Sequence, residues 1–125
     1  MSNFTRQVVP VGEHLHIVAR FFAPEGEPRA AVLVVPAMGV TQAYYALFAQ
    51  WLATHGYLVA TFDYRGVGQS RHGSLRKLSA DILDWARGDC AAMIDAVADL
   101  APGRPLYWVG HSLGGQILPL SLIHI

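Results

Sequence analysis

The feature that most constrains the fold of this chain is an apolar run that ends in Gly-x-Ser-x-Gly. Residues 106–109 read Leu-Tyr-Trp-Val and lead directly into residues 110–114, Gly-His-Ser-Leu-Gly. This order predicts a buried strand that turns sharply into a helix, with Ser112 at the apex of the turn. The chain therefore has to provide a sheet in which such a strand can be buried.

Steric crowding explains why glycines surround Ser112. Gly110 and Gly114 remove Cβ atoms that would collide in a strained turn. Gly115 is expected to let the helix pack close to the strand. The pattern arises by chance in roughly one chain in twenty or thirty, and the alternative is an ordinary turn with a capping serine. Its position between a strand and a helix makes the pattern far more specific.

Apolar runs and polar turns divide the rest of the chain into strands. Residues 30–35 are continuously apolar, which is typical of a parallel strand covered on both faces. In the hairpin that turns at Gly12, His14, His16 and Val18 alternate with Leu15, Ile17 and Ala19, so one face is expected to be wetter. Strands are predicted at residues 8–9, 15–22, 30–35, 57–62 and 106–109.

Two helices are predicted between these strands. The first runs from about Gln42 to His55 behind a Thr41 cap, and its buried stripe is expected to comprise Tyr44, Leu47, Phe48, Trp51 and Leu52. The second starts at Ser79 or Asp81, and its core face is expected to comprise Ile82, Ala86, Cys90, Met93, Val97 and Leu100. The alternation of strands and helices indicates one parallel α/β sheet with right-handed crossovers.

Composition narrows the function classes. Nine basic residues balance nine acidic ones, so nothing favours nucleic acid or an anionic membrane surface as a partner. No apolar run reaches membrane-spanning length and residues 1–6 lack the core of a signal peptide, so a cytoplasmic protein is expected. Cys90 is the single cysteine and is expected in the core, which excludes a disulfide framework or a cysteine metal site. One lysine and abundant alanine suggest a bacterial source.

Two further stretches carry a family resemblance. Residues 35–39, Val-Pro-Ala-Met-Gly, lie where α/β-hydrolases carry an oxyanion loop, commonly His-Gly-x-Gly. Residues 63–70, DYRGVGQS, resemble the Asp-x-Arg-Gly-x-Gly-x-Ser that follows the family's fourth strand. From Val8 to Pro119 the chain resembles the N-terminal half of an α/β-hydrolase of the serine aminopeptidase-like or monoacylglycerol-lipase-like branch. This implies a mostly parallel sheet with an antiparallel N-terminal hairpin and helices on both faces.

The resemblance also implies a reaction. Ser112 would be the nucleophile of a serine hydrolase that cleaves an ester, amide or related acyl bond of a small molecule, without a cofactor or metal. The backbone N–H groups of Leu113 and, by alignment, Met38 would form the oxyanion hole. Pro36-Ala37 departs from the family's His-Gly, but the hole uses backbone groups, so this change is tolerable.

Other residues near these motifs receive weaker assignments. Met38, Tyr44 and Tyr45 are candidates to line the acyl pocket, with ordinary packing as the alternative. His111 is expected to point away from the attack site and to pack or hydrogen-bond near the oxyanion loop. Asp63 and Arg65 are expected to form a structural network. None of the remaining histidines is a convincing base, a group that comprises His14, His16, His55 and His72.

The acid and the base that the resemblance implies beyond Ser112 are not among residues 113–119. In the family the acid and the base histidine follow the serine, so residues 1–119 are expected to be a truncated domain that is itself inactive. Residues 120–125, Leu-Ser-Leu-Ile-His-Ile, are the translation of the start of a common transposon-end sequencing adapter; a genuine helix is the alternative. A non-catalytic binding or interaction scaffold remains the alternative function, and the oligomeric state is left open.

Overall fold

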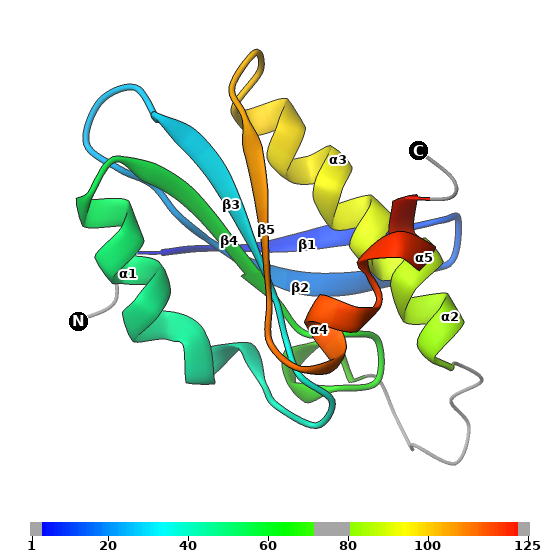
Figure 1. Ribbon diagram of the computed structural model, residues 1–125. Helices are drawn as coiled ribbons and strands as arrows, with labels where there is room; N and C mark the ends of the chain where they lie inside the picture. The colour runs from blue at the N-terminus through cyan, green and yellow to red at the C-terminus, as the bar shows by residue number, and fades with distance from the viewer. Residues whose placement is uncertain (1–3, 72–80, 123–125) are drawn as a thin grey trace.

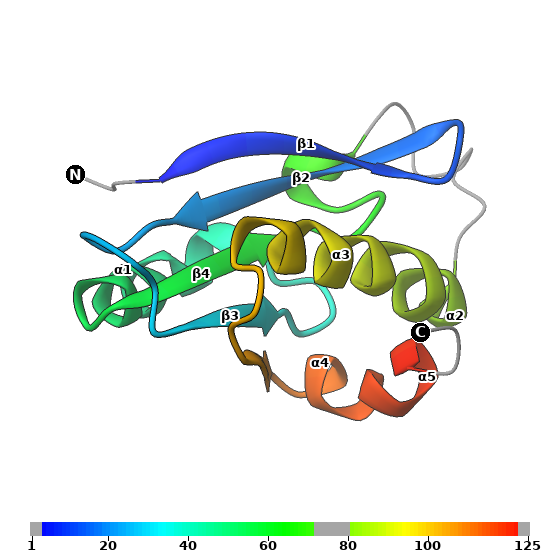
Figure 2. The same cartoon turned by 90° about the horizontal axis from the view of Figure 1, so that it is seen from above.

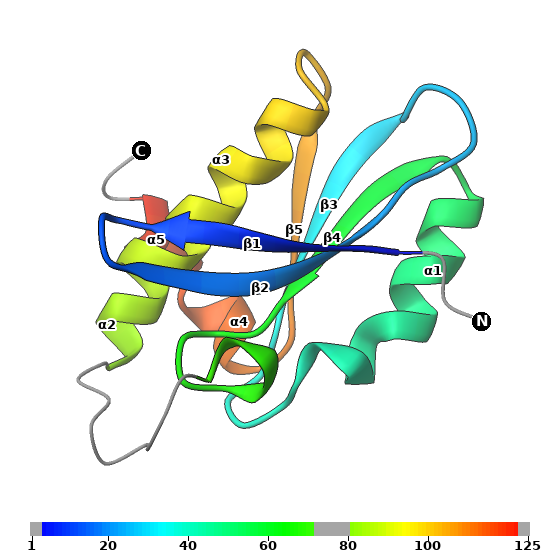
Figure 3. The ribbon, with the colours of Figure 1, turned by 180° about the vertical axis from the view of Figure 1, so that it is seen from behind.

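The computed structural model describes residues 4–71 and 81–122. They contain a five-stranded sheet in the order β1-β2-β4-β3-β5 (Figure 1). The strands are β1 (Thr5–Val11), β2 (Leu15–Phe22), β3 (Ala30–Val35), β4 (Tyr57–Phe62) and β5 (Leu106–Gly110). β2 is antiparallel to β1 and β4, whereas β3 lies between β4 and β5 and is parallel to both. The predicted mixed sheet with an antiparallel N-terminal hairpin is confirmed (Figure 3).

Helices cover both faces of this sheet. One face carries the 3-10 turn η1 (Gln42–Tyr45) and α1 (Ala46–Thr54), and the other carries a continuous helical segment. That segment comprises α2 (Ile82–Asp84), the π-helical turn η4 (Trp85–Cys90) and α3 (Ala91–Leu100). The 3-10 turn η2 (Gly68–Ser70) follows β4, whereas α4 (Leu113–Gln116) and α5 (Leu118–Leu122) follow β5 (Figure 2). No helix within residues 4–71 and 81–122 is long and apolar enough to cross a bilayer.

The central strand β3 is buried on both faces, as its apolar run predicts. All six of its residues are buried. Leu33 and Val35 belong to the apolar cluster beneath α3, whereas Val32 and Val34 belong to the cluster beneath α1. Because this buried strand pairs in parallel with β5, the loops after β3 and β5 leave the sheet at the same edge.

The predicted buried stripe of the first helix is wrong. Leu47 is 84% exposed, and Tyr44, Phe48 and Trp51 are exposed as well; only Leu52 is half-buried. The face against the sheet instead carries Gln42, Tyr45, Ala49 and Ala53. Two alanines allow a close approach of α1 to the sheet, and the two polar side chains find hydrogen-bond partners there. Side-chain size and hydrogen bonding, rather than hydropathy, select this face.

The expectation of a wetter face on β2 is wrong at Val18, which is 1% exposed, whereas Leu15 is 44% exposed. Two polar side chains, Ser70 from η2 and Gln42 from η1, account for the burial of Val18. The Val18 N–H donates to Ser70 Oγ at 2.8 Å, and the Val18 carbonyl oxygen accepts from Gln42 Nε2 at 3.0 Å. These two polar side chains cover the strand where simple alternation predicts solvent.

The second helix follows its prediction in the middle and departs from it at both ends. Its fully buried apolar residues are Ala86, Cys90, Met93 and Val97, as expected, whereas Ile82 and Leu100 are 38% and 50% exposed. Asp81 caps the helix through a capping box with Asp84; the alternative start at Ser79 lies outside the described residues. The π-helical turn was not predicted, and Asp89 within it is fully buried.

Candidate active site

Ser112 occupies a strained turn between β5 and α4. Its backbone has φ 55° and ψ −112°, and no other non-glycine residue among residues 4–71 and 81–122 has a positive φ. An L-residue pays for such a conformation, which persists only where the surroundings enforce it. Ser112 is exposed, and the N–H groups of Gly115 and Gln116 both donate to its carbonyl oxygen at 3.0 and 3.3 Å. The turn therefore presents the serine side chain outside the sheet.

Two glycines make this turn possible. A Cβ on Gly114 would overlap the carbonyl group of Val35, lying 2.7 Å from its carbon. A Cβ on Gly110 would lie 2.5 Å from the Gly115 Cα and would overlap the Gly115 nitrogen. A Cβ on Gly115 itself would come no closer than 3.6 Å to Gly110. A side chain at position 115 would therefore fit, so close packing of α4 on β5 does not depend on glycine at this position.

The loop after β3 stands beside this turn. Val35 and Gly110 are paired in the β3–β5 ladder, and the His111 N–H donates to the Val35 carbonyl oxygen at 3.0 Å. Met38 and Leu113 each lie three residues beyond this pair. Within residues 4–71 and 81–122, neither of their N–H groups has a hydrogen-bond acceptor. The structure thus places two backbone donors without an acceptor among the described residues at the carboxyl-terminal edge of β3 and β5.

The neighbouring N–H, that of Ala37, is already used. It donates to the Tyr45 hydroxyl oxygen at 2.9 Å, and this hydroxyl also lies 2.9 Å from His111 Nδ1. Tyr44 stacks on the His111 ring, with centroids 6.1 Å apart and planes 7° apart. The His111 side chain therefore lies against η1, near the loop after β3.

The three residues predicted to line an acyl pocket have different surroundings. Met38 and Tyr44 are 57% and 71% exposed, whereas Tyr45 is 7% exposed and uses its hydroxyl in the loop. Burial raises the pKa of Tyr45 and outweighs the opposite effect of the Ala37 N–H. The sequence carried no local signal for this role of Tyr45, because its partners are 8 and 66 residues away in the chain.

Asp63 belongs to a structural network, as expected. Its carboxylate, on a residue that is 1% exposed, accepts from the Gln42 N–H at 2.7 Å, from Gln42 Nε2 at 3.1 Å and from the Gln69 N–H at 3.0 Å. These bonds fasten the loop after β4 to the start of η1. Arg65 is paired with Asp89 at 2.8 Å. The role of Asp89 was not foreseen. His72 lies outside the described residues.

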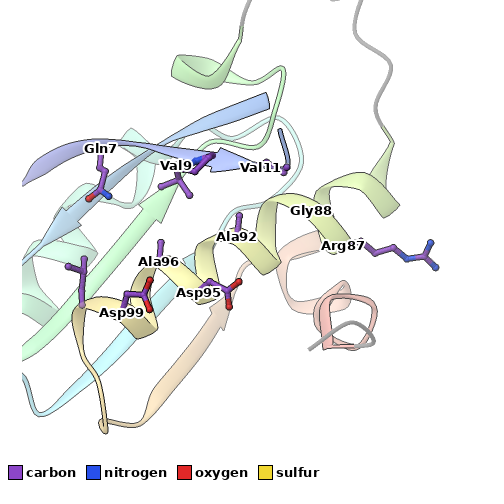
Figure 4. Close-up of a pocket in the computed structure, with 12 residues that line it drawn as sticks. Gln7, Val9, Val11, Arg87, Gly88, Ala92, Asp95, Ala96 and Asp99 are labelled. Carbon is purple, nitrogen blue, oxygen red and sulfur yellow. The ribbon is translucent and has the colours of Figure 1, made fainter. Parts of the chain in front are cut away.

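A groove on another part of the molecule is separate from this edge. It lies between β1 and the helix that ends in α3, holds about 560 Å³, and is lined among others by Val9, Val11, Asp95 and Asp99 (Figure 4). Ser112, Met38 and Leu113 are not among its lining residues. In residues 4–71 and 81–122, no three His, Cys, Asp or Glu side chains are grouped as a metal site.

Comparison with known proteins gives the family. The family described as Serine aminopeptidase, S33 matches residues 26–123. Monoglyceride lipase from Homo sapiens is 30% identical over 94% of this chain and 40% of the lipase. Two solved structures share the fold. A thermostable carboxyl esterase from Bacillus coagulans, in complex with glycerol, has TM-score 0.78 at 21% identity over 97% of this chain and 40% of the esterase. A soluble variant of monoglyceride lipase from Saccharomyces cerevisiae has TM-score 0.70 at 20% identity over 94% and 36%.

The chain spans about 40% of the length of the curated relatives it matches. The strands β3, β4 and β5, the loop after β3 and the segment after β5 fall inside the region matched by the family, whereas β1 and β2 precede it. The chain belongs to the serine aminopeptidase S33 family of α/β-hydrolases.

Proposed function

We propose that the protein to which this chain belongs is a serine hydrolase with Ser112 as its nucleophile. The observation that carries this proposal is the positive φ of Ser112, 55°, at an exposed turn between the edge strand β5 and the helix α4. Backbone strain at an exposed side chain that can attack carbonyl groups is typical of a functional site.

The reaction would use the two free N–H groups beside the serine. Ser112 Oγ bonds to the acyl carbon while a base takes its proton, and the carbonyl oxygen becomes an oxyanion held by the N–H groups of Met38 and Leu113. The leaving alcohol or amine then takes the proton. Water attacks the acyl-enzyme, releases the acid and restores the hydroxyl.

The base is the part that the described residues do not supply. None of the histidines in residues 4–71 and 81–122 hydrogen-bonds Ser112, and His111 Nδ1 is engaged by Tyr45. We therefore propose that the 125-residue chain by itself is inactive, since oxyanion donors alone retain a small part of the rate of a triad enzyme.

The proposed substrate class is a carboxylic ester of glycerol. Relatives from Homo sapiens and Saccharomyces cerevisiae are named monoglyceride lipases, and the Bacillus coagulans relative is a carboxyl esterase. The exposed apolar side chains of Met38 and Tyr44, near the free donors in sequence, suit an acyl chain.

The test uses the full-length gene product with a fluorophosphonate probe and three substrates: a monoacylglycerol, a p-nitrophenyl ester and an aminoacyl p-nitroanilide. We expect labelling at Ser112, its loss in Ser112→Ala, and a preference for the esters. Preference for the anilide would reject the ester as substrate class and leave the assignment of Ser112 as nucleophile standing. Equal labelling and hydrolysis by Ser112→Ala would reject the nucleophile, and absence of both in the parent would favour the scaffold alternative.

A further inference from the structure

The peptide group between Pro36 and Ala37 is hydrogen-bonded at both ends by tyrosine hydroxyls. The Tyr64 hydroxyl donates to the Pro36 carbonyl oxygen at 2.8 Å, and the Ala37 N–H donates to the Tyr45 hydroxyl oxygen at 2.9 Å. The two tyrosines are 0% and 7% exposed. Two buried side chains, rather than a strand or helix ladder, thus satisfy one loop peptide completely.

The two tyrosines reach this peptide from different layers of the molecule. Tyr64 belongs to the apolar cluster beneath α3, and Tyr45 belongs to the cluster beneath α1. In a trans peptide the C=O and N–H groups point in opposite directions, and no peptide in residues 4–71 and 81–122 is cis. A flip of this peptide would break both hydrogen bonds and leave the buried Tyr64 hydroxyl without its acceptor, which is costly.

Further contacts hold each tyrosine in place. The Tyr64 ring stacks on Trp85, with centroids 4.4 Å apart and planes 8° apart. Because the Tyr45 hydroxyl oxygen accepts from Ala37, its own proton is available to His111 Nδ1, 2.9 Å away. Burial raises the pKa of both tyrosines, so both hydroxyls keep their protons at physiological pH. Tyr45 therefore links the loop after β3 to the residue that precedes Ser112.

We propose that Tyr45 and Tyr64 are positioning residues that clamp the Pro36–Ala37 peptide and thereby hold the Met38 N–H ready for the oxyanion. The Ala37 N–H is occupied by the Tyr45 hydroxyl, whereas the next N–H, that of Met38, is left without an acceptor among the described residues. This inference rests on the proposed function of Ser112. It also offers a reason why the loop keeps its shape with Pro36-Ala37 in place of the family's His-Gly.

The kinetic test compares Tyr45→Phe, Tyr64→Phe and the double variant in the full-length gene product. Each change removes one hydroxyl and keeps the ring. We expect kcat to fall about 3- to 30-fold in each single variant and about 100-fold in the double variant, which approaches the loss of one oxyanion donor. KM should stay within about twofold, because the donor acts on the transition state. Rates are expressed per active site titrated with fluorophosphonate, so that unfolded protein does not count.

The matched control is Tyr107→Phe, which removes the hydroxyl of a tyrosine on β5 that is 55% exposed. It should leave kcat and KM unchanged. A boronic acid that forms a tetrahedral adduct should bind the clamp variants more weakly by the same factor as the fall in kcat. A rise in KM with constant kcat, or lower thermal stability with constant kcat per site, would overturn the proposal.

A second measurement does not depend on activity. Amide hydrogen exchange should show Ala37 protected and Met38 unprotected in the parent, with the protection of Ala37 lost in Tyr45→Phe. Persistence of that protection would contradict the clamp even if Ser112 proved to be the nucleophile. Conversely, activity retained in Ser112→Ala together with the expected exchange pattern would reject the proposed function and leave the clamp as a structural feature.

Discussion

The buried carboxylate of Asp89 accepts two hydrogen bonds from Arg65 and forms an ion pair with its guanidinium. The donors are the Arg65 backbone N–H at 2.7 Å and Nε at 2.9 Å, and Nη2 lies 2.8 Å from Asp89 Oδ1. The Asp89 side chain is 0% exposed and that of Arg65 is 13% exposed. This pair joins the loop after β4 to the π-helical turn, and Arg65 also donates to the Asp84 carbonyl oxygen at 3.3 Å. Tyr64, which reaches the Pro36 carbonyl, is the residue before Arg65.

Breaking this pair should destabilise the protein strongly. Asp89→Asn keeps the shape of the side chain but leaves the guanidinium of Arg65 without its counter-charge, and we expect a loss of about 3 kcal/mol in the free energy of unfolding. Urea denaturation of the full-length gene product measures it. Asp95→Asn, at an exposed position on α3, is the control and should stay within about 0.5 kcal/mol. Equal effects of the two changes would show that the pair contributes nothing.

The sequence predicted those parts of the fold that follow from local pattern. The continuous apolar run at residues 30–35 predicts a strand covered on both faces, and β3 is one. Its parallel pairing with β5 follows from the alternation of strands and helices. The glycines around Ser112 predicted a tight turn because steric exclusion acts between residues close in the chain.

The predictions that proved wrong concern positions whose burial is set by residues distant in the chain. Val18 is buried because Ser70 and Gln42 cover it, and these lie 52 and 24 residues away. The face of α1 was assigned by hydropathy, whereas alanines and hydrogen-bonded polar groups pack on the sheet. The hydrogen bonds of the Tyr45 and Tyr64 hydroxyls had no sequence signature, since their partners in the loop after β3 lie 8 and 28 residues away in the chain.

The two glycines flanking Ser112 should tolerate substitution less well than the third. Gly114→Ala places a Cβ against the Val35 carbonyl, so β3 and α4 have to separate. We expect a loss of about 2 kcal/mol or more in the free energy of unfolding, typical of overpacking against backbone. Thermal denaturation of the full-length gene product measures it.

Gly115→Ala is the matched control, because its new Cβ makes only ordinary contact at 3.6 Å. Since Gly115 lies in α4, alanine should be neutral or slightly stabilising there. A larger loss at Gly115 than at Gly114 would contradict the packing described for this turn.

Alkali should destabilise the protein through its buried tyrosines. Burial raises the pKa of Tyr45 and Tyr64 above the ordinary value of 10.0. Their contribution to stability is complete below pH 10; above it the unfolded chain releases phenolic protons that the folded chain keeps, so stability falls as pH rises. Above pH 10, each tyrosine lowers the free energy of unfolding by up to about 1.4 kcal/mol per pH unit. Burial also raises the pKa of Cys90, to about 12, which adds a loss of the same sign above its ordinary value of 9.0.

Urea midpoints measured from about pH 8 to about pH 11 test this dependence. Above pH 10, Tyr45→Phe should reduce the fall of the urea midpoint with rising pH. Tyr107→Phe, at an exposed position on β5, should leave that fall unchanged. The same slope in both variants would show that Tyr45 ionises alike in the folded and unfolded chains.

We propose that residues 120–125 are translated adapter rather than natural sequence. The first three of these residues continue the helix α5, which spans Leu118–Leu122. Resequencing the locus from a genomic clone should show the reading frame departing near Pro119. A clone that continues in frame through Ile125 and then stops would reject the proposal.

Expressed alone, the 125-residue chain should associate. Within the residues that the structure describes, β5 pairs with β3 alone, so one side of its backbone has no strand partner. Tyr107 and Val109 on β5 are 55% and 37% exposed, and an exposed apolar edge strand promotes pairing between chains. Size-exclusion chromatography with light scattering should show oligomers that diminish in Tyr107→Lys, because a charge on an edge strand opposes pairing. Leu15→Lys, on the internal strand β2, adds the same charge and should diminish them less. A monodisperse parent, or equal effects of the two lysines, would show that association does not proceed through β5.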